Sequence, residues 1–360
     1  MNQLLKDIFF TYESINSLAD AVQQAYPKFD RGRFLDLIYD EAWEGRALME
    51  KMSHAAVCLH ESLPDSYGQS LEILKQVAPS VMGFEALTFP EFVAVYGQDE
   101  RDLSLPALGY FTKYGSAEFA IRPFLVSDPD RTMEYMVRWS KNDDPMVRRL
   151  ASEGCRPRLP WGIALHTFRQ DPGPILPILE NLKDDDAETV RRSVSNNLND
   201  ISKDHPDLVL DICERWYGTS EHTNWIVKHA CRSMLKAGNT RAMLLFGFGD
   251  PVDIHVNSLE FDKKEVRIGE EVYFSFTLVV DTTGESKVRL EYAVDFIKAR
   301  GQTSRKVFQI KELSYDPGSY PIKKKHSFVD RSTRKHYPGD HQFTIIINGT
   351  EKARAMLRVH

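Results

Sequence analysis

The chain has 360 residues, enough for two or three domains, and its 42% hydrophobic and 27% charged residues are ordinary for a soluble globular protein. It contains no run of 18 apolar residues and no signal peptide at its N-terminus, so we expect a cytoplasmic protein without a membrane association. The four cysteines are scattered without a CxxC pair, which argues against a disulfide framework and against a zinc site.

The net charge of −6 is unevenly distributed along the chain. Residues 1–130 hold 10 Lys and Arg against 20 Asp and Glu, residues 131–251 hold 17 against 17, and residues 252–360 hold 19 against 15. Attraction to phosphate acts over about one Debye length, roughly 8 Å, so a locally basic surface is sufficient for it. The overall negative charge therefore does not exclude a nucleic-acid partner.

Residues 1 to about 250 are predicted to be helical throughout. Ile226, Val227, Ala230, Met234 and Ala237 keep an apolar period of 3.6 residues, and DP, GP and HP dipeptides separate one helix from the next. The expected helices are Ser14–Tyr26, Arg33–Ile38 continuing through Ala42–Ser62, Tyr67–Val77, Thr132–Ser140, Val147–Ala151, Ile175–Leu182, Glu188–Ile201, Leu208–Trp216 and Thr223–Ala237.

The pattern changes after Pro251 to an alternation of apolar and polar residues, which is typical of strands. The clearest examples are 272–280, 288–294 and 343–347, with GE, TTGE, DPGS and PGD turns between or near them. Seven or so short strands in about 110 residues favour an immunoglobulin-like sandwich without the usual disulfide. We therefore predict two domains, a helical one over 1–250 and an all-β one over 252–360.

Three segments of the helical part resemble one another. They share an acidic or polar start and a valine followed by basic or near-basic residues, and they are 143–152 (DDPMVRRLAS), 185–195 (DDAETVRRSVS) and 221–233 (EHTNWIVKHACRS). The aligned valines Val147, Val190 and Val227 are 43 and 37 residues apart, a spacing typical of HEAT and armadillo repeats. A cation that recurs at one repeat position lies on one face of the solenoid, so the sequence predicts a basic stripe suited to a polyanion.

The first of these repeats runs into a motif that contains two more arginines, a glutamate and a tryptophan. Together with GSAEFAIRPFL (115–125) and VRRSVSNNLND (190–200), the motif SEGCRPRLPW (152–161) resembles the AlkC/AlkD family of bacterial alkylated-base DNA glycosylases, in particular the AlkC branch with a C-terminal immunoglobulin-like domain. The resemblance implies a HEAT-like solenoid that hydrolyses the N-glycosidic bond of cationic N3-alkylated bases, such as 3-methyladenine and 3-methylcytosine. It also implies double-stranded DNA as the partner, no base flipping, and no metal or other cofactor; we expect a monomer, associated with the nucleoid when bound to DNA.

The residues fit this chemistry. A base that already carries positive charge is a good leaving group, so hydrolysis mainly requires stabilisation of an oxocarbenium-like sugar and a positioned water, both of which a carboxylate supplies. Glu118, Glu153 and Asp200 are the candidates, and Trp161 is the candidate for a cation–π contact with the base or the sugar.

Each candidate also has a purely structural interpretation. Glu153 could only pair with Arg156 or Arg158, Glu118 could be an exposed helical carboxylate or the partner of Arg122, Trp161 could belong to the core, and Asp200 could form a salt bridge or cap a helix.

The candidate DNA-binding residues are the cations of the repeats and the motif, together with a cluster in the sandwich. They are Arg148, Arg149, Arg156, Arg158, Arg191, Arg192, Lys228, Lys298 and Arg300. The arginine pairs could instead form a solvated face or bind aspartates of the next repeat, and the sandwich cations could merely increase solubility. The alternative function is a non-enzymatic HEAT-repeat scaffold for a protein or DNA partner.

Overall fold

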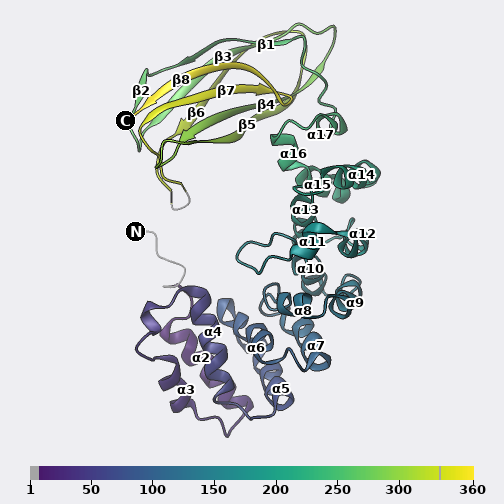
Figure 1. Cartoon of the computed structure of the whole chain (residues 1–360), viewed down its shortest axis with the longest axis vertical. Helices are drawn as coiled ribbons and strands as arrows, with labels where there is room; N and C mark the ends of the chain where they lie inside the picture. The colour runs from purple at the N-terminus through teal and green to yellow at the C-terminus, as the bar shows by residue number, and fades with distance from the viewer. Residues whose placement is uncertain (1–7, 332–333) are drawn as a thin grey trace. The chain divides into compact units, whose positions relative to one another are not determined.

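The computed structural model describes residues 8–331 and 334–360, and the chain divides between Ala230 and Cys231 into two compact units. The first unit is helical, and the second contains two short helices followed by strands (Figure 1). None of the helices in the described ranges has the length and apolar character needed to cross a membrane.

The helices of the first unit are mostly 8–14 residues long and are joined by short turns. They are α2 (Tyr12–Ala25), α3 (Arg31–Ile38), α4 (Leu48–His60), α5 (Tyr67–Val77), α6 (Thr88–Tyr96), α7 (Arg101–Phe111), α8 (Arg122–Ser127), α9 (Pro129–Trp139), α10 (Pro145–Glu153), α11 (His166–Gln170), α12 (Leu176–Asn181), α13 (Glu188–Ile201), α14 (Pro206–Trp216) and α15 (Glu221–Ala230). Four 3-10 helices lie between them: η1 (Trp43–Gly45), η2 (Ala78–Ser80), η3 (Gly83–Leu87) and η4 (Gly173–Ile175).

The predicted repeat is present in three dimensions. Helices α10, α13 and α15 pack against one another in succession, and they carry the three aligned valines, all of which are buried (Figure 1). The start of α10 shows why the chain forms a helix there: Asp144 Oδ1 accepts a hydrogen bond from Met146 N at 2.8 Å, and Pro145 occupies the first turn. The prediction of a helical-repeat fold is confirmed.

Two expected helices are interrupted. The stretch from Arg33 to Ser62 is not continuous, because α3 ends at Ile38 and α4 begins only at Leu48. The stretch from Thr223 to Ala237 breaks at Cys231, so that Met234 lies on a separate helix. In both cases an apolar period continues across a turn, because residues on either side of a short break can still face the same core.

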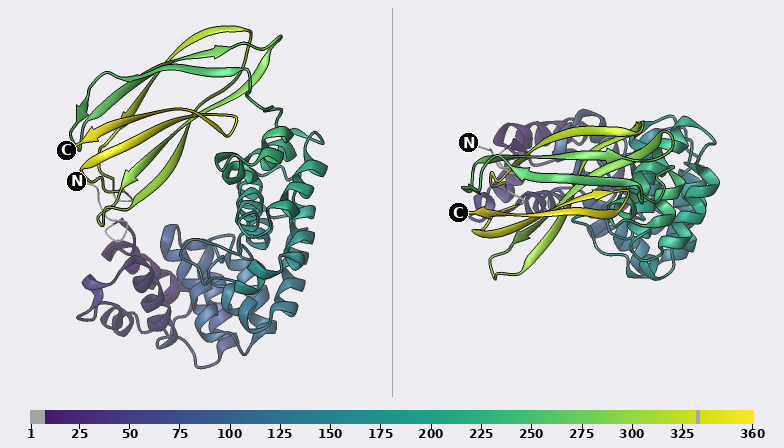
Figure 2. Two further views of the ribbon diagram at one scale, coloured as in Figure 1. Left: turned by 45° about the horizontal axis from the view of Figure 1, so that its top comes forward. Right: turned by 90° about the horizontal axis from the view of Figure 1, so that it is seen from above.

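The second unit begins with α16 (Arg232–Lys236) and α17 (Thr240–Leu245) and continues as strands. The strands are β1 (Ile254–Phe261), β2 (Glu265–Val266), β3 (Glu271–Val280), β4 (Ser286–Ile297), β5 (Thr303–Tyr315), β6 (Gly318–Ser327), β7 (Gly339–Ile347) and β8 (Thr350–Val359). They form one sheet in the order β1-β3-β6 and another in the order β2-β8-β7-β4-β5, seen from two sides in Figure 2.

In the described ranges every strand pair is antiparallel except β2 with β8. Apolar residues from both sheets form a single core that includes Phe274, Tyr292 and Phe343. The prediction of an immunoglobulin-like sandwich is confirmed. The domain limits 1–250 and 252–360 stay a prediction. In the structure, the segment with α16 and α17 belongs to the compact unit of the sandwich, and the backbones of Gly238 and Gly349 approach so closely that a side chain would collide at either position.

Candidate active site

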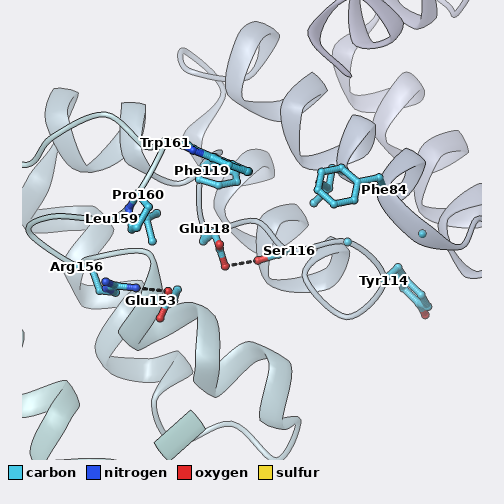
Figure 3. Close-up of a pocket in the computed structure, with 13 residues that line it drawn as sticks. Phe84, Tyr114, Ser116, Glu118, Phe119, Glu153, Arg156, Leu159, Pro160 and Trp161 are labelled. Carbon is cyan, nitrogen blue, oxygen red and sulfur yellow. Dashed lines mark hydrogen bonds and ion pairs between the residues drawn. The ribbon is translucent and has the colours of Figure 1, made fainter. Parts of the chain in front are cut away.

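A pocket of about 490 Å³ lies in the first unit where three segments meet. Phe84 comes from η3, Ser116 and Glu118 from the turn before α8, and Glu153 from the last turn of α10 (Figure 3). The loop after α10 adds Trp161. The structure thus brings three of the four predicted catalytic residues, Glu118, Glu153 and Trp161, to one pocket.

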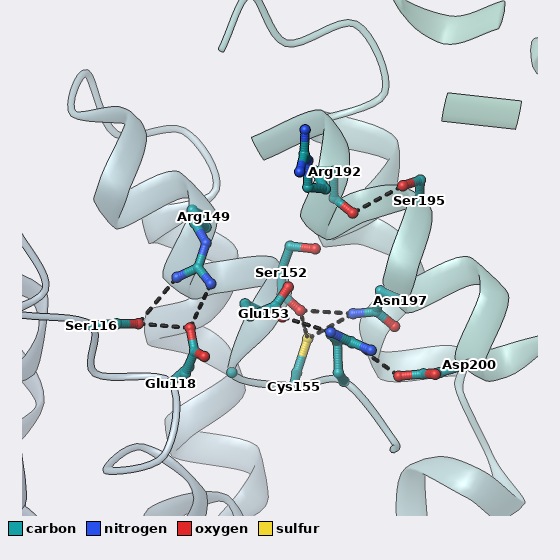
Figure 4. Close-up of polar contacts among 12 residues, drawn as sticks. Ser116, Glu118, Arg149, Ser152, Glu153, Cys155, Arg192, Ser195, Asn197 and Asp200 are labelled. Atoms are coloured by element: carbon teal, nitrogen blue, oxygen red, sulfur yellow. Dashed lines mark hydrogen bonds and ion pairs between the residues drawn. The ribbon is translucent and has the colours of Figure 1, made fainter. Parts of the chain in front are cut away.

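Glu118 is held in the turn by two donors. Its Oε2 accepts a hydrogen bond from Ser116 Oγ at 2.7 Å and lies 2.6 Å from Arg149 Nη2 (Figure 4). Arg149 also donates from Nη1 to Ser116 Oγ at 3.1 Å. Ser116 and Arg149 thus fix the orientation of this carboxylate at the pocket wall.

Glu153 belongs to a second, more deeply buried cluster. Arg156 Nη1 donates to Glu153 Oε1 at 2.6 Å, and Arg156 Nε donates to Asp200 Oδ2 at 2.9 Å. Burial opposes the charge of the Arg156 guanidinium, but the two carboxylates together outweigh this effect, and the pKa of Arg156 is raised. Asp200 also accepts from Lys203 Nζ at 3.1 Å. Arg156 thus links Asp200 to Glu153.

These contacts decide between the interpretations that the sequence left open. Glu153 does pair with Arg156, yet it still lines the pocket, so the two interpretations do not exclude each other. Glu118 pairs with Arg149 and not with Arg122, whose side chain is fully buried. Asp200 forms salt bridges to Arg156 and Lys203.

Trp161 is not a core residue. Its side chain is 74% exposed at the rim of the pocket, so the interpretation of this tryptophan as core is wrong. Its φ of +65° lies in the left-handed region, which costs a bulky residue on the order of 1–3 kcal/mol, and such strained residues cluster at functional sites. Phe119 and Phe84 line the same pocket, so aromatic rings form much of its apolar wall (Figure 3).

Several predicted DNA-binding arginines form contacts within the chain. Arg148 makes a bidentate contact to Asp185 at 2.6 and 3.0 Å, at the start of the next repeat, and Arg191 donates to the backbone oxygens of Asp185 and Asp186. Arg158 binds Asp204 and thereby lowers the pKa of that carboxyl. Arg148 thus matches the interpretation in which a repeat arginine binds an aspartate of the following repeat, whereas Arg191 bonds to the backbone at the start of its own repeat.

The remaining predicted cations lie outside the pocket. Arg192 is 65% exposed on α13, where it pairs with Glu188, and Lys228 lies in the last turn of α15. Lys298 and Arg300 belong to the other unit, where they line a second pocket of about 490 Å³ together with Arg334. Lys335 adds a further cation to the lining of that pocket, beside Tyr337. The DNA-contact assignments stay predictions.

Comparisons with known proteins place this geometry in a family. A family described as DNA alkylation repair enzymes matches residues 112–234, and a family of C-terminal Ig-like domains from the YhaZ proteins matches residues 255–360. The uncharacterised protein YhaZ of Bacillus subtilis is 44% identical over 351 residues, which is 97% of each chain.

A solved structure covers nearly the whole chain. The alkylpurine DNA glycosylase AlkC of Pseudomonas fluorescens, bound to DNA containing an abasic site analogue, is 39% identical with a TM-score of 0.96, over 99% of this chain and 100% of that chain. The chain belongs to the AlkC/AlkD family of DNA glycosylases. The family resemblance seen in the segments 115–125, 152–161 and 190–200 is confirmed.

Some residues that line this candidate pocket were not identified from the sequence. Ser116, Phe84, Tyr114 and Phe119 line it, and only Ser116 and Phe119 lie in a segment that the resemblance had marked. Phe84 lies far from every motif, so no local signal identified it. Within residues 8–331 and 334–360, no group of three or more His, Cys, Asp or Glu is arranged to hold a metal ion.

Proposed function

We propose that this glycosylase removes cationic N3-alkylated bases, such as 3-methyladenine and 3-methylcytosine, from double-stranded DNA during base-excision repair, without flipping the damaged nucleotide. The observation that carries the proposal is the placement of two arginine-paired carboxylates, Glu118 and Glu153, and one exposed indole around a single pocket.

The carboxylates would stabilise the sugar cation. As the bond to a cationic base breaks, positive charge moves from the base to the deoxyribose, and a fixed negative charge nearby lowers the barrier. Glu118 and Glu153 are held in place by ion pairs with Arg149 and Arg156, so these carboxylates would act as positioned negative charges and by orienting water. A strong general acid is unnecessary because the leaving base is neutral once it has departed.

Trp161 would select for positive charge. An indole face attracts a cation by about 0.5–2 kcal/mol, so it would bind the alkylated base or the developing sugar cation better than a neutral base. Enzymes that flip a base enclose it in a snug pocket between side chains. Here the indole is 74% exposed at the rim, a position from which it could meet a lesion that remains in the stack.

The DNA contacts are proposed from the relative of known structure, which was solved with DNA. Exposed cations, including Arg192 on α13 and Arg300 in the sandwich, would bind backbone phosphates. The protein would act as a cytoplasmic monomer that joins the nucleoid when bound to DNA. Affinity should then fall with salt at a slope of about −0.9 per phosphate contact, and neutralising one contacting arginine should lower the slope by about one.

Base release tests the proposal directly. Methylated duplex DNA is incubated with the full chain, and the freed bases are identified by mass; we expect 3-methyladenine and 3-methylcytosine, with little release of neutral damaged bases. Duplexes with a bulkier N3-alkyl group should also be processed, because an unflipped base need not fit an enclosing pocket. Release of no base from any duplex would favour the scaffold alternative, and strict exclusion of bulky adducts would argue for flipping.

A further inference from the structure

Arg122 is a fully buried cation without a carboxylate partner in the described part of the chain. It begins α8, four residues after Glu118, and is the largest of the fully buried side chains. Burial lowers the pKa of Arg122 to about 10, which still leaves the guanidinium charged at neutral pH. A buried charge is costly unless its donors are satisfied, so its partners indicate what it does.

The side-chain hydrogen bonds of Arg122 in the described structure all go to backbone oxygens of one loop. Nη1 donates to Gly154 O at 2.8 Å and to Arg156 O at 3.0 Å, and Nε donates to Ile163 O at 2.6 Å. The guanidinium therefore ties the two ends of the loop to a single rigid group. Nη2 has no hydrogen-bond partner in the described structure, so these three oxygens accept all the side-chain hydrogen bonds. The carboxylates of Glu118 and Asp200 attract the charge from beyond salt-bridge distance.

This loop carries both the guanidinium and the indole that line the pocket, on Arg156 and Trp161. Between Gly154 and Leu165 the chain forms neither helix nor strand, and it presents Arg156 to Glu153 and Asp200 before it places Trp161 at the rim. Trp161 occupies the left-handed region, a conformation that persists only where the surroundings enforce it. The bond from Arg122 to Ile163 lies two residues after Trp161 and is suited to enforce it.

We propose that Arg122 is a positioning residue for base excision: it holds the loop 154–163 in the shape that aims Arg156 at Glu153 and keeps Trp161 at the pocket rim. The inference rests on the proposed function and adds a residue that touches neither DNA nor the reacting atoms. A planar guanidinium suits the task because it offers several donors in a fixed geometry, whereas lysine offers one flexible point charge.

Gly162 gives an independent way to disturb the same contact. A Cβ at this position would lie 3.1 Å from both Cδ and Nε of Arg122 and 3.1 Å from Leu159 Cδ2, tighter than ordinary contact. The backbone of Gly162 is outside the left-handed region, so alanine adds crowding without backbone strain. Gly162→Ala therefore pushes the loop away from Arg122 and removes no hydrogen-bonding group.

The test is a double-mutant cycle with single-turnover base release by the full chain. Gly162→Ala should slow release about 10–100-fold, since small misplacements of a positioned group have effects of this size. The same change in a Trp161→Ala background should slow release much less, because the loop then has less to position. Gly45→Ala, where a Cβ meets nothing within 4 Å, is the matched control and should stay within about twofold of wild type.

Arg122→Lys should follow Gly162→Ala if it folds, with a lower rate and nearly unchanged affinity for an abasic-site duplex. If Arg122 and Gly162 had only a structural role, their substitutions would lower the melting temperature. They would not change the rate at which folded molecules release base in either background. Two outcomes would overturn this inference alone. One is that Gly162→Ala releases base at the wild-type rate, and the other is that Gly162→Ala slows release equally in the wild-type and Trp161→Ala backgrounds. Absence of release by the wild type would instead overturn the proposed function as well.

Discussion

Both units of this chain bury an arginine between two carboxylates, and the two clusters differ in what lies beside them. In the helical unit Arg156 binds Glu153 and Asp200, and in the sandwich Arg289 binds Glu291 at 2.6 Å and also Glu312. Both arginines are nearly inaccessible, with side chains 9% and 3% exposed. Burial and pairing are therefore common to the two clusters.

The sandwich cluster is a cross-strand contact. Arg289 of β4 lies opposite Glu312 of β5, and Glu291 follows two residues later on the same face of β4. Burial raises the pKa of Glu291 in spite of the neighbouring arginine. In the helical cluster Glu153 lines the pocket. The comparison teaches that a buried ion pair alone is no sign of function, and that access to a pocket is the informative property.

The largest effect is expected from Arg289→Met. Removing one partner of a buried pair leaves the others uncompensated and typically costs about 3–5 kcal/mol of unfolding free energy. Base release by the molecules that remain folded should be unchanged. Urea unfolding measures the free energy of unfolding, and single-turnover kinetics measure the rate of base release. Arg156→Met, the matched change in the helical unit, should lower both the unfolding free energy and the release rate.

Glu153→Gln should slow base release by roughly 10²–10³ while the fold and the affinity for DNA stay nearly intact. The amide keeps the shape of the side chain and removes the charge that would stabilise the sugar cation. Glu118→Gln should behave similarly, whereas Glu291→Gln in the sandwich should leave release unchanged. Wild-type rates for both Glu118→Gln and Glu153→Gln would show that these carboxylates are structural charges only.

Acid should weaken the sandwich through buried histidines. Burial lowers the pKa of His326 to about 3, and it also lowers the pKa values of His336 and His341. An unfolded histidine titrates near 6.5, so the unfolded chain takes up protons first as the pH falls. Stability should be complete above about pH 6.5 and be lost below it, by at most about 1.4 kcal/mol per pH unit for each histidine.

Thermal unfolding between pH 7 and pH 4 measures this loss. His326→Gln should flatten the pH dependence, and His255→Gln, a change at a half-exposed ring, should not. An unchanged slope in the His326 variant would mean that the acid sensitivity arises elsewhere.

Trp161→Ala should give the smallest change in stability, within about 0.5 kcal/mol, because its side chain is 74% exposed. Base release should nevertheless slow by about 2- to 30-fold, the equivalent of losing a cation–π contact of about 0.5–2 kcal/mol. Trp43→Ala, at a ring only 4% exposed, is the contrasting control and should destabilise the fold. Equal release by Trp161→Ala and wild type would remove the indole from the mechanism.

The architecture was readable from periodicity. The change from a 3.6-residue to a 2-residue apolar pattern after Pro251 separated helices from strands, and α13 has the predicted limits of Glu188 and Ile201. The breaks at Cys231 and before Leu48 were missed, since a hydrophobic period reports which face is buried and is silent about a turn that preserves that face.

The sequence by itself determined the helical repeat, the β-sandwich and the motif that resembles a glycosylase, because these depend on local spacing and residue type. Only the tertiary structure decided which charges meet. Arg149 reaches back to Glu118, Arg156 reaches forward to Asp200, and Arg122 turns inward to the loop that carries Trp161. These arginines have the same chemistry and differ in the direction in which their side chains point. Their partners are therefore fixed by the packing of segments that are distant in the sequence.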